Sequence, residues 1–81
     1  MNVRIKLFSL ARDLAGFSEQ MVDLGRNPRA GAVLEYLSEH HPEFADWRSS
    51  IRIAVNQEYV SNEHALNEGD EVAVIPPVSG G

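Results

Sequence analysis

Residues Leu66–Gly81 read LNEGDEVAVIPPVSGG, and this stretch determines how the domain ends. The EGD triplet is a turn signal, because Gly and Asp both favour turn backbone. The next five residues, Glu71–Ile75, alternate their apolar side chains in the period of a β-strand. Pro76 and Pro77 lack the N–H groups that a sheet requires, so the strand must end before them.

Alternating segments elsewhere predict further strands. Val3, Ile5 and Leu7 share one side of a strand near the N-terminus. The same reasoning places strands at residues 18–24, 51–55 and 59–60, with a tight turn at 56–58, where Asn56 tolerates positive φ. The segment ARDLA (residues 11–15) predicts a short helical turn closed by Gly16.

One longer helix is predicted between the second and third strands. Asn27 can cap free N–H groups, Pro28 suits the first helical position and Pro42 ends the helix. One face is apolar at spacings of three and four, through Ala30, Val33, Leu34 and Leu37. Further along, Phe44 and Trp47 are expected to anchor packing below the helix.

The predicted order is strand, strand, helix, strand, strand, strand, which is an α+β layer with one open sheet face. The 81 residues make one domain, 1–75, followed by an extended tail, 76–81. A core this thin leaves no room for a deep substrate cavity, which argues against a self-sufficient enzyme.

Composition narrows the function further. The net charge is −5 and the basic residues form no run, which argues against nucleic-acid binding. The acidity either keeps the chain soluble or suits a basic partner. No apolar stretch could span a bilayer and no targeting segment is recognisable, so a cytoplasmic location is expected. No metal site is predicted at His40, His41 or His64, and no hydrolase triad or phosphate loop is found.

The tail carries the most specific chemistry. Six extended residues reach about 20 Å, far enough to enter another protein's active site. Glycines at positions 80 and 81 pass a narrow channel and leave the Gly81 carbonyl carbon open to a nucleophile. Once activated as an acyl-adenylate, this carboxylate could accept sulfur and become a thiocarboxylate. A chain without cysteine offers no competing thiol, although a merely frayed tail remains the alternative.

Three segments resemble the small subunits of molybdopterin synthase, within the ubiquitin-like β-grasp sulfur carriers. They are LFSLARDLAG (residues 7–16), AVNQEYV (residues 54–60) and LNEGDEVAVIPPVSGG, and together they span the chain. The first fits loosely, with Ser9 where Ala is usual and Asp13 where Glu is usual. The resemblance implies a β-grasp fold with a mixed sheet of about five strands and one main helix on one face.

It also implies the reaction sequence. An ATP-dependent, E1-like enzyme would adenylate Gly81, and sulfur would then replace a carboxylate oxygen. The chain would bind no cofactor but would carry covalent glycyl adenylate and 1-thioglycine forms at Gly81, next to Gly80. In a heterotetramer with the large subunit, it would donate sulfur to cyclic pyranopterin monophosphate. The chain would be the non-catalytic, sulfur-donating subunit.

Strand alternation suggests where partners dock. Phe8 and Ile75 share the open sheet face if the first and last strands are neighbours, and Tyr59 extends this patch. Alternatively, Phe8 folds into the core. Arg12 either holds an anionic partner group or pairs with Asp13 or Glu19. The partner-binding tail residues are expected to be Pro76, Pro77, Val78 and Ser79.

Other functions stay open from the sequence. The chain could carry sulfur for thiamin or cysteine synthesis, since these carriers share the fold and the Gly-Gly end. It could be a ubiquitin-like modifier that attaches Gly81 to lysines. It could also be an interaction domain whose tail has no chemistry.

Overall fold

A computed structural model describes residues 1–76, apart from the side chains of Ser9 and Leu10, so predictions for residues 77–81 lie outside the described residues. The chain forms one five-stranded sheet in the order β2-β1-β5-β3-β4. β1 and β5 are parallel, and the other neighbouring strands are antiparallel. The strands are β1 (Asn2–Leu7), β2 (Glu19–Asp23), β3 (Arg52–Val55), β4 (Glu58–Val60) and β5 (Glu71–Ile75). The predicted mixed sheet is confirmed.

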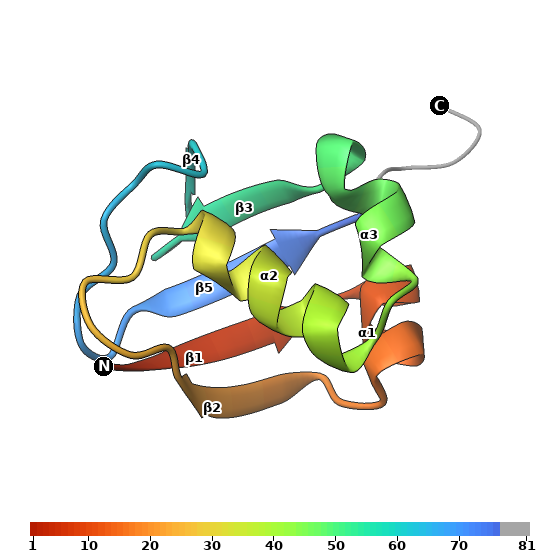
Figure 1. The fold of residues 1–81 in the computed structure, drawn as a ribbon, viewed down its shortest axis with the longest axis horizontal. Helices are drawn as coiled ribbons and strands as arrows, with labels where there is room; N and C mark the ends of the chain where they lie inside the picture. The colour runs from red at the N-terminus through yellow and green to blue at the C-terminus, as the bar shows by residue number, and fades with distance from the viewer. Residues whose placement is uncertain (77–81) are drawn as a thin grey trace.

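Helices cover one face of this sheet. The longest, α2 (Gly31–His40), crosses the face of β1 and β5, and α1 (Ser9–Ala15) lies at the end where β1 finishes (Figure 1). Gly16 has a φ of 82°, the left-handed conformation that ends α1. The predicted short helical segment and its glycine stop are confirmed, and the helix begins two residues earlier than predicted.

The core lies between α2 and the sheet. Val3, Ile5 and Leu7 of β1 are buried with Val72 and Val74 of β5, as the alternation predicted. The predicted apolar face of α2 is also confirmed, since it is fully buried. The remaining members of the core are Ala11, Val22, Ala30, Val33, Leu34, Leu37, Phe44, Ile51, Ile53, Val55 and Leu66.

The predicted start of the long helix is wrong. Asn27 has a φ of 48° and is not helical, and α2 begins only at Gly31. The N–H groups of Ala30 and Gly31 donate to carbonyl oxygens of the loop at residues 62–64, at 2.8 and 2.9 Å. Those carbonyls satisfy the donors that a capping side chain would have served. The loop therefore delays the helix by three residues.

The same contact explains a glycine at the helix start. A Cβ at Gly31 would lie only 3.2 Å from Cβ of Asn62, which is tighter than most real contacts. The Pro28 carbonyl accepts from the Leu66 N–H at 3.0 Å, and Arg29 bridges to Ala65. The segment before α2 thus lies along the loop before β5.

Two short helical segments follow α2 and were not predicted. They are α3 (Phe44–Trp47) and a 3-10 turn, η1 (Arg48–Ser50). Phe44 is buried and Trp47 half-buried, with ring centroids 6.0 Å apart in an edge-on arrangement. The prediction that these two aromatic residues pack below the helix is confirmed.

A polar network fixes the start of β5. Asp70, only 9% exposed, accepts hydrogen bonds from the Asn56 side chain at 3.0 Å and from the Asn67 N–H at 2.8 Å. Asn56 in turn accepts from the Glu71 N–H at 3.1 Å. Asn56 and Gln57 both have positive φ and form a two-residue hairpin turn, so the turn predicted at 56–58 is one residue shorter and Glu58 already belongs to β4. Because β5 leads into the tail, this network anchors the strand that presents the tail.

Candidate partner-binding face and C-terminal tail

The face of the sheet opposite α2 carries three of the predicted partner-binding residues, Phe8, Tyr59 and Ile75. Its central row runs from Lys6 through Ala73 and Ala54 to Tyr59, as the pairing registers of four strands show. The two alanines leave a shallow floor between longer side chains. A face built this way is accessible to a flat partner surface.

Phe8 and Tyr59 are exposed on this side of the sheet. Phe8 follows β1 with extended backbone (φ −129°, ψ 154°), so it continues the alternation of Arg4 and Lys6. Its side chain is 48% exposed, which excludes the alternative that it belongs to the core, and Tyr59 is 64% exposed. Leu7 pairs with Val74, and this register places Phe8 beside Ile75, which is half-buried.

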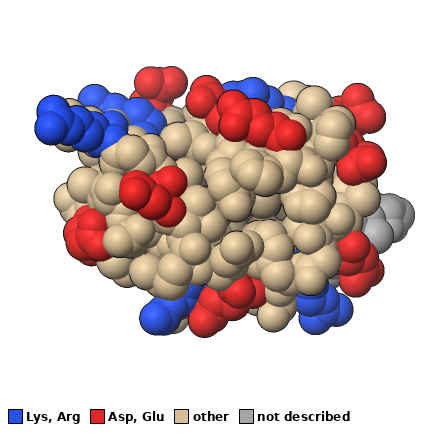
Figure 2. Space-filling view, turned by 60° about the horizontal axis from the view of Figure 1, so that its bottom comes forward, with Lys and Arg blue, Asp and Glu red and all other residues tan. Residues whose placement is uncertain are grey.

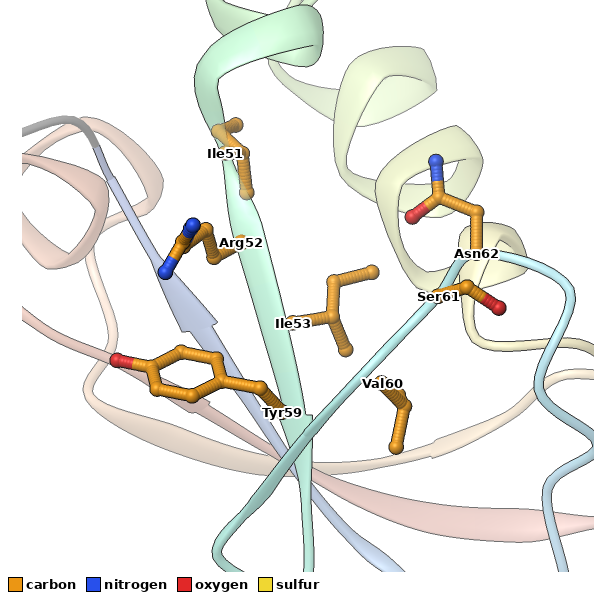
Figure 3. Close-up of a pocket in the computed structure, with 7 residues that line it drawn as sticks. All are labelled: Ile51, Arg52, Ile53, Tyr59, Val60, Ser61 and Asn62. Carbon is orange, nitrogen blue, oxygen red and sulfur yellow. The ribbon is translucent and has the colours of Figure 1, made fainter.

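Arg52 links these residues and was missed from the sequence. It pairs with Ile75 in the sheet, and its guanidinium lies 5.4 Å from the centre of the Tyr59 ring. In Figure 3, Arg52 and Tyr59 point to one side of β3, and Ile53 points to the other. The alternation of residues 51–55 already contained the signal, because a polar residue between two buried isoleucines must face outward. We call Phe8, Arg52, Tyr59 and Ile75 the docking patch.

A shallow hollow adjoins the docking patch at the edge of the sheet. It has a volume of about 340 Å³ and lies where β4 diverges from β3 (Figure 3). Ile51, Ile53 and Val60 contribute apolar lining, and Ser61 and Asn62 contribute polar groups. This hollow is too open to enclose a small substrate.

The other half of the open face is charged. Lys6 Nζ lies 3.1 Å from Glu71 Oε1 and 3.8 Å from Glu19 Oε1. Arg4 Nε lies 3.7 Å from Glu19 Oε2. These pairs cross β2, β1 and β5, so the charged half is internally neutralised rather than basic.

Arg12 and Pro76 lie apart from this network. Arg12 Nε is 3.9 Å from Asp13 Oδ1, one of the two pairings considered from the sequence, whereas Glu19 pairs with Arg4 and Lys6 instead. Pro76 follows β5 directly and is buried. The predicted roles of Pro77, Val78, Ser79, Gly80 and Gly81 lie outside the described residues.

Among residues 1–76, no group of three or more His, Asp or Glu side chains is placed to hold a metal ion. The His40 side chain instead lies within hydrogen-bonding distance of its own helix, with Nδ1 2.9 Å from the Tyr36 carbonyl oxygen. Basic side chains are interleaved with acidic ones on the face that Figure 2 shows, without a continuous basic stripe. No helix in the described part of the chain is long and apolar enough to cross a membrane.

One acidic side chain is held at the N-terminus. Asp23 Oδ1 accepts hydrogen bonds from the Gly25 N–H at 2.9 Å and from the Met1 ammonium at 3.0 Å. The Gly25 N–H and the ammonium lower the pKa of the Asp23 carboxyl below its ordinary value of 3.8. Since Met1 also donates to the Gly25 carbonyl at 2.9 Å, the first residue is tied to the end of β2.

Comparison with known proteins extends these observations. The ThiS family model matches residues 5–81. The chain is 37% identical to the molybdopterin synthase sulfur carrier subunit of Chlamydomonas reinhardtii, over the full length of both proteins. A putative molybdopterin converting factor subunit 1 from Pyrococcus furiosus is 32% identical with a TM-score of 0.84, covering 96% of this chain and 99% of its own. SAMP1 from Haloferax volcanii is 30% identical with a TM-score of 0.82, covering all of both chains. These neighbours confirm the ubiquitin-like β-grasp fold, and the family match over nearly the whole length shows that the chain belongs to the ThiS family.

Proposed function

We propose that this chain is a sulfur carrier in molybdenum cofactor biosynthesis, with the Gly81 carboxylate as the group that carries sulfur. The observation that carries the proposal is similarity over the whole chain to molybdopterin synthase sulfur carrier subunits, with a sequence that ends on Gly80-Gly81. The fold supports it, because β5 leads directly into the tail that bears these glycines.

The chemistry requires activation by another protein. A carboxylate is a poor electrophile, so an E1-like enzyme would use ATP to form the glycyl adenylate at Gly81. A sulfur donor would then attack the carbonyl carbon, and AMP would leave with the bridging oxygen. The product is a C-terminal thiocarboxylate, and the partner enzyme would catalyse both steps.

The docking patch gives the carrier a way to reach its acceptor. Phe8 and Tyr59 are exposed, and Ile75 stands at the start of the tail. A large subunit seated on this patch would receive a tail of six residues, which spans about 20 Å. Cyclic pyranopterin monophosphate bound there would take the sulfur, and Arg12 and tail residues 77–79 would contact the large subunit. We expect two carriers on a dimer of large subunits, in the cytoplasm.

A second candidate function is protein modification. It is favoured by the similarity to SAMP1 from Haloferax volcanii over the full length of both chains, since a related structure from that organism is described as small archaeal modifier protein 1. In this case the activated Gly81 carbonyl would be attacked by a lysine of a target protein. Sulfur carriage for thiamin or cysteine synthesis would use the same Gly81 chemistry with a different acceptor.

The test is the intact mass of the protein after incubation with ATP, an E1-like enzyme and a sulfur source. We expect a gain that matches exchange of one oxygen for sulfur, confined to the C-terminal peptide. A variant lacking Gly81 is the matched control and should gain nothing while keeping its unfolding temperature. No gain in the full chain, with an enzyme shown to be active on another carrier, would refute the proposal. Isopeptide adducts on cellular proteins would favour the modifier function instead.

A further inference from the structure

The chain is poor in side-chain amines and thiols, the groups that would compete most for the activated acyl group of the proposed function. Of its seven basic residues six are arginines, Lys6 is the only lysine, and it contains no cysteine. A guanidinium is not deprotonated in proteins, so arginine provides positive charge without a nucleophilic amine. Lys6 is therefore the one side-chain amine that could compete with sulfur for an activated Gly81 and form a stable amide.

That competition is a balanced reaction. The Lys6 Nζ lone pair would bond to the Gly81 carbonyl carbon, and the C–O bond to phosphate would break. AMP would leave with the electron pair, and the amine proton would pass to solvent. The product would be an amide that carries no sulfur, formed within one chain or between two chains.

Lys6 is within reach of its own tail. It pairs with Ala73, two residues before the end of β5. Neighbouring strands are about 4.8 Å apart and each residue advances about 3.3 Å, so Cα of Lys6 lies about 8 Å from Cα of Ile75. The six residues after Ile75 reach about 20 Å, which is enough to return Gly81 to Lys6.

The structure holds this amine on both sides. Glu71 Oε1 lies 3.1 Å from Nζ and Glu19 Oε1 lies 3.8 Å from it, and the Lys6 side chain is only 34% exposed. To attack an acyl group, Nζ must leave both carboxylates and release a proton. The Met1 amine is held in a similar way, 3.0 Å from Asp23 Oδ1 and 2.9 Å from the Gly25 carbonyl oxygen.

We infer that Glu71 and Glu19 are specificity-determining residues that hold Lys6 away from the activated Gly81 and so leave its carbonyl carbon to sulfur. The inference rests on the proposed function, because it assigns a role to the surroundings of the same reactive carboxylate. It adds that two carboxylates outside the tail, on β2 and β5, decide which nucleophile that carbon meets.

The first experiment measures amine reactivity without using Gly81 chemistry. The full chain is treated with a limiting amount of the N-hydroxysuccinimide ester of acetylglycine, and acylation of each amine is followed by peptide mass mapping. In the double variant Glu19→Gln, Glu71→Gln we expect Lys6 to react about fivefold faster, the upper range for release of an exposed ion pair (about 1 kcal/mol). The variant Arg26→Lys gives a reference, because Arg26 is exposed and makes no ion pair among residues 1–76.

The second experiment adds an E1-like enzyme and ATP without a sulfur source. We expect the double variant to lose the mass of water or to form covalent dimers, and we expect Lys6→Arg in the same background to abolish those products. The inference would be overturned if Lys6 reacted at the same rate in the native chain and in the double variant, and if that rate equalled the rate of the amine that Arg26→Lys introduces at position 26. Its failure is separate from failure of the proposed function, which is read from thiocarboxylate formation. Unchanged urea unfolding of the double variant would show that reactivity, not folding, has changed.

Discussion

Truncating Phe8 to alanine should weaken binding to the large subunit by a calculable amount. A phenylalanine side chain buries about 200 Å² when it is fully covered, so a side chain that is 48% exposed still offers about 100 Å². At about 25 cal/mol per Å² this area contributes about 2.5 kcal/mol on docking. Alanine keeps only Cβ, so we expect a loss of about 2 kcal/mol, or about 30-fold in Kd.

Isothermal titration of the cognate large subunit measures this loss. The matched control is Met21→Ala, because Met21 is 53% exposed and lies on the same sheet face but on β2, away from the docking patch. The control should change Kd less than about threefold. The reasoning is refuted if Phe8→Ala binds as tightly as the native chain, or if Met21→Ala loses as much. About half of each side chain is covered within the domain, so urea unfolding of both variants checks that they are fully folded under the conditions of the titration.

Three further predictions concern the fold that presents the tail. Asp70→Ala should lower the free energy of unfolding in urea by about 2 kcal/mol, because the buried carboxylate accepts hydrogen bonds from Asn56 and Asn67. The control is Asp46→Ala at an exposed position, and an equal loss of stability in both variants would contradict the role of the network. Gln57→Gly should raise the free energy of unfolding by up to about 1 kcal/mol, because Gln57 has a φ of 73° and Asn-Gly suits this hairpin turn; unchanged or lowered stability would show that the turn is not strained. Asp23→Asn should reduce the dependence of stability on acid pH. The folded pKa of Asp23 is lowered, so its contribution is present above the ordinary pKa of 3.8 and lost as the pH falls through the folded value. Thermal melts of the native and variant chains are compared from about pH 2 to about pH 6, the range in which carboxyl groups titrate. The difference between the two melting temperatures should shrink toward the acid end. A difference that stays constant with pH would contradict this assignment.

Most of the secondary structure could be predicted from local patterns. Val3, Ile5 and Leu7 alternate with polar residues, and the structure buries all three. The Asn56 turn follows from the tolerance of asparagine for positive φ, and its φ is 50°. The strand that ends before Pro76 follows from the missing N–H groups of proline. Each of these features depends on a residue and its immediate neighbours.

Contacts between segments that are distant in the sequence could not be predicted from such local patterns. Asn27 and Pro28 form a good local signal for a helix start, but the N–H groups of Ala30 and Gly31 donate to carbonyls 34 and 31 residues further along the chain, in the loop at 62–64. Arg52 was recognisable as outward-facing, but its position over Tyr59 needed the pairing of β3 with β4. The short helix α3 was missed because four residues carry too little periodicity to distinguish a helix from a loop.

The sequence alone supplies the chemistry proposed for this chain, since the proposed carrier group is the Gly81 carboxylate and the supply of side-chain amines and thiols is a matter of composition. Tertiary structure alone decided the environment of that chemistry. Parallel pairing of β1 with β5 brings Glu71 to Lys6 across most of the chain length, and antiparallel pairing of β1 with β2 adds Glu19. The physical reason is that charge pairing and exposed area depend on distances between strands, which the sheet register sets and which no local sequence pattern contains.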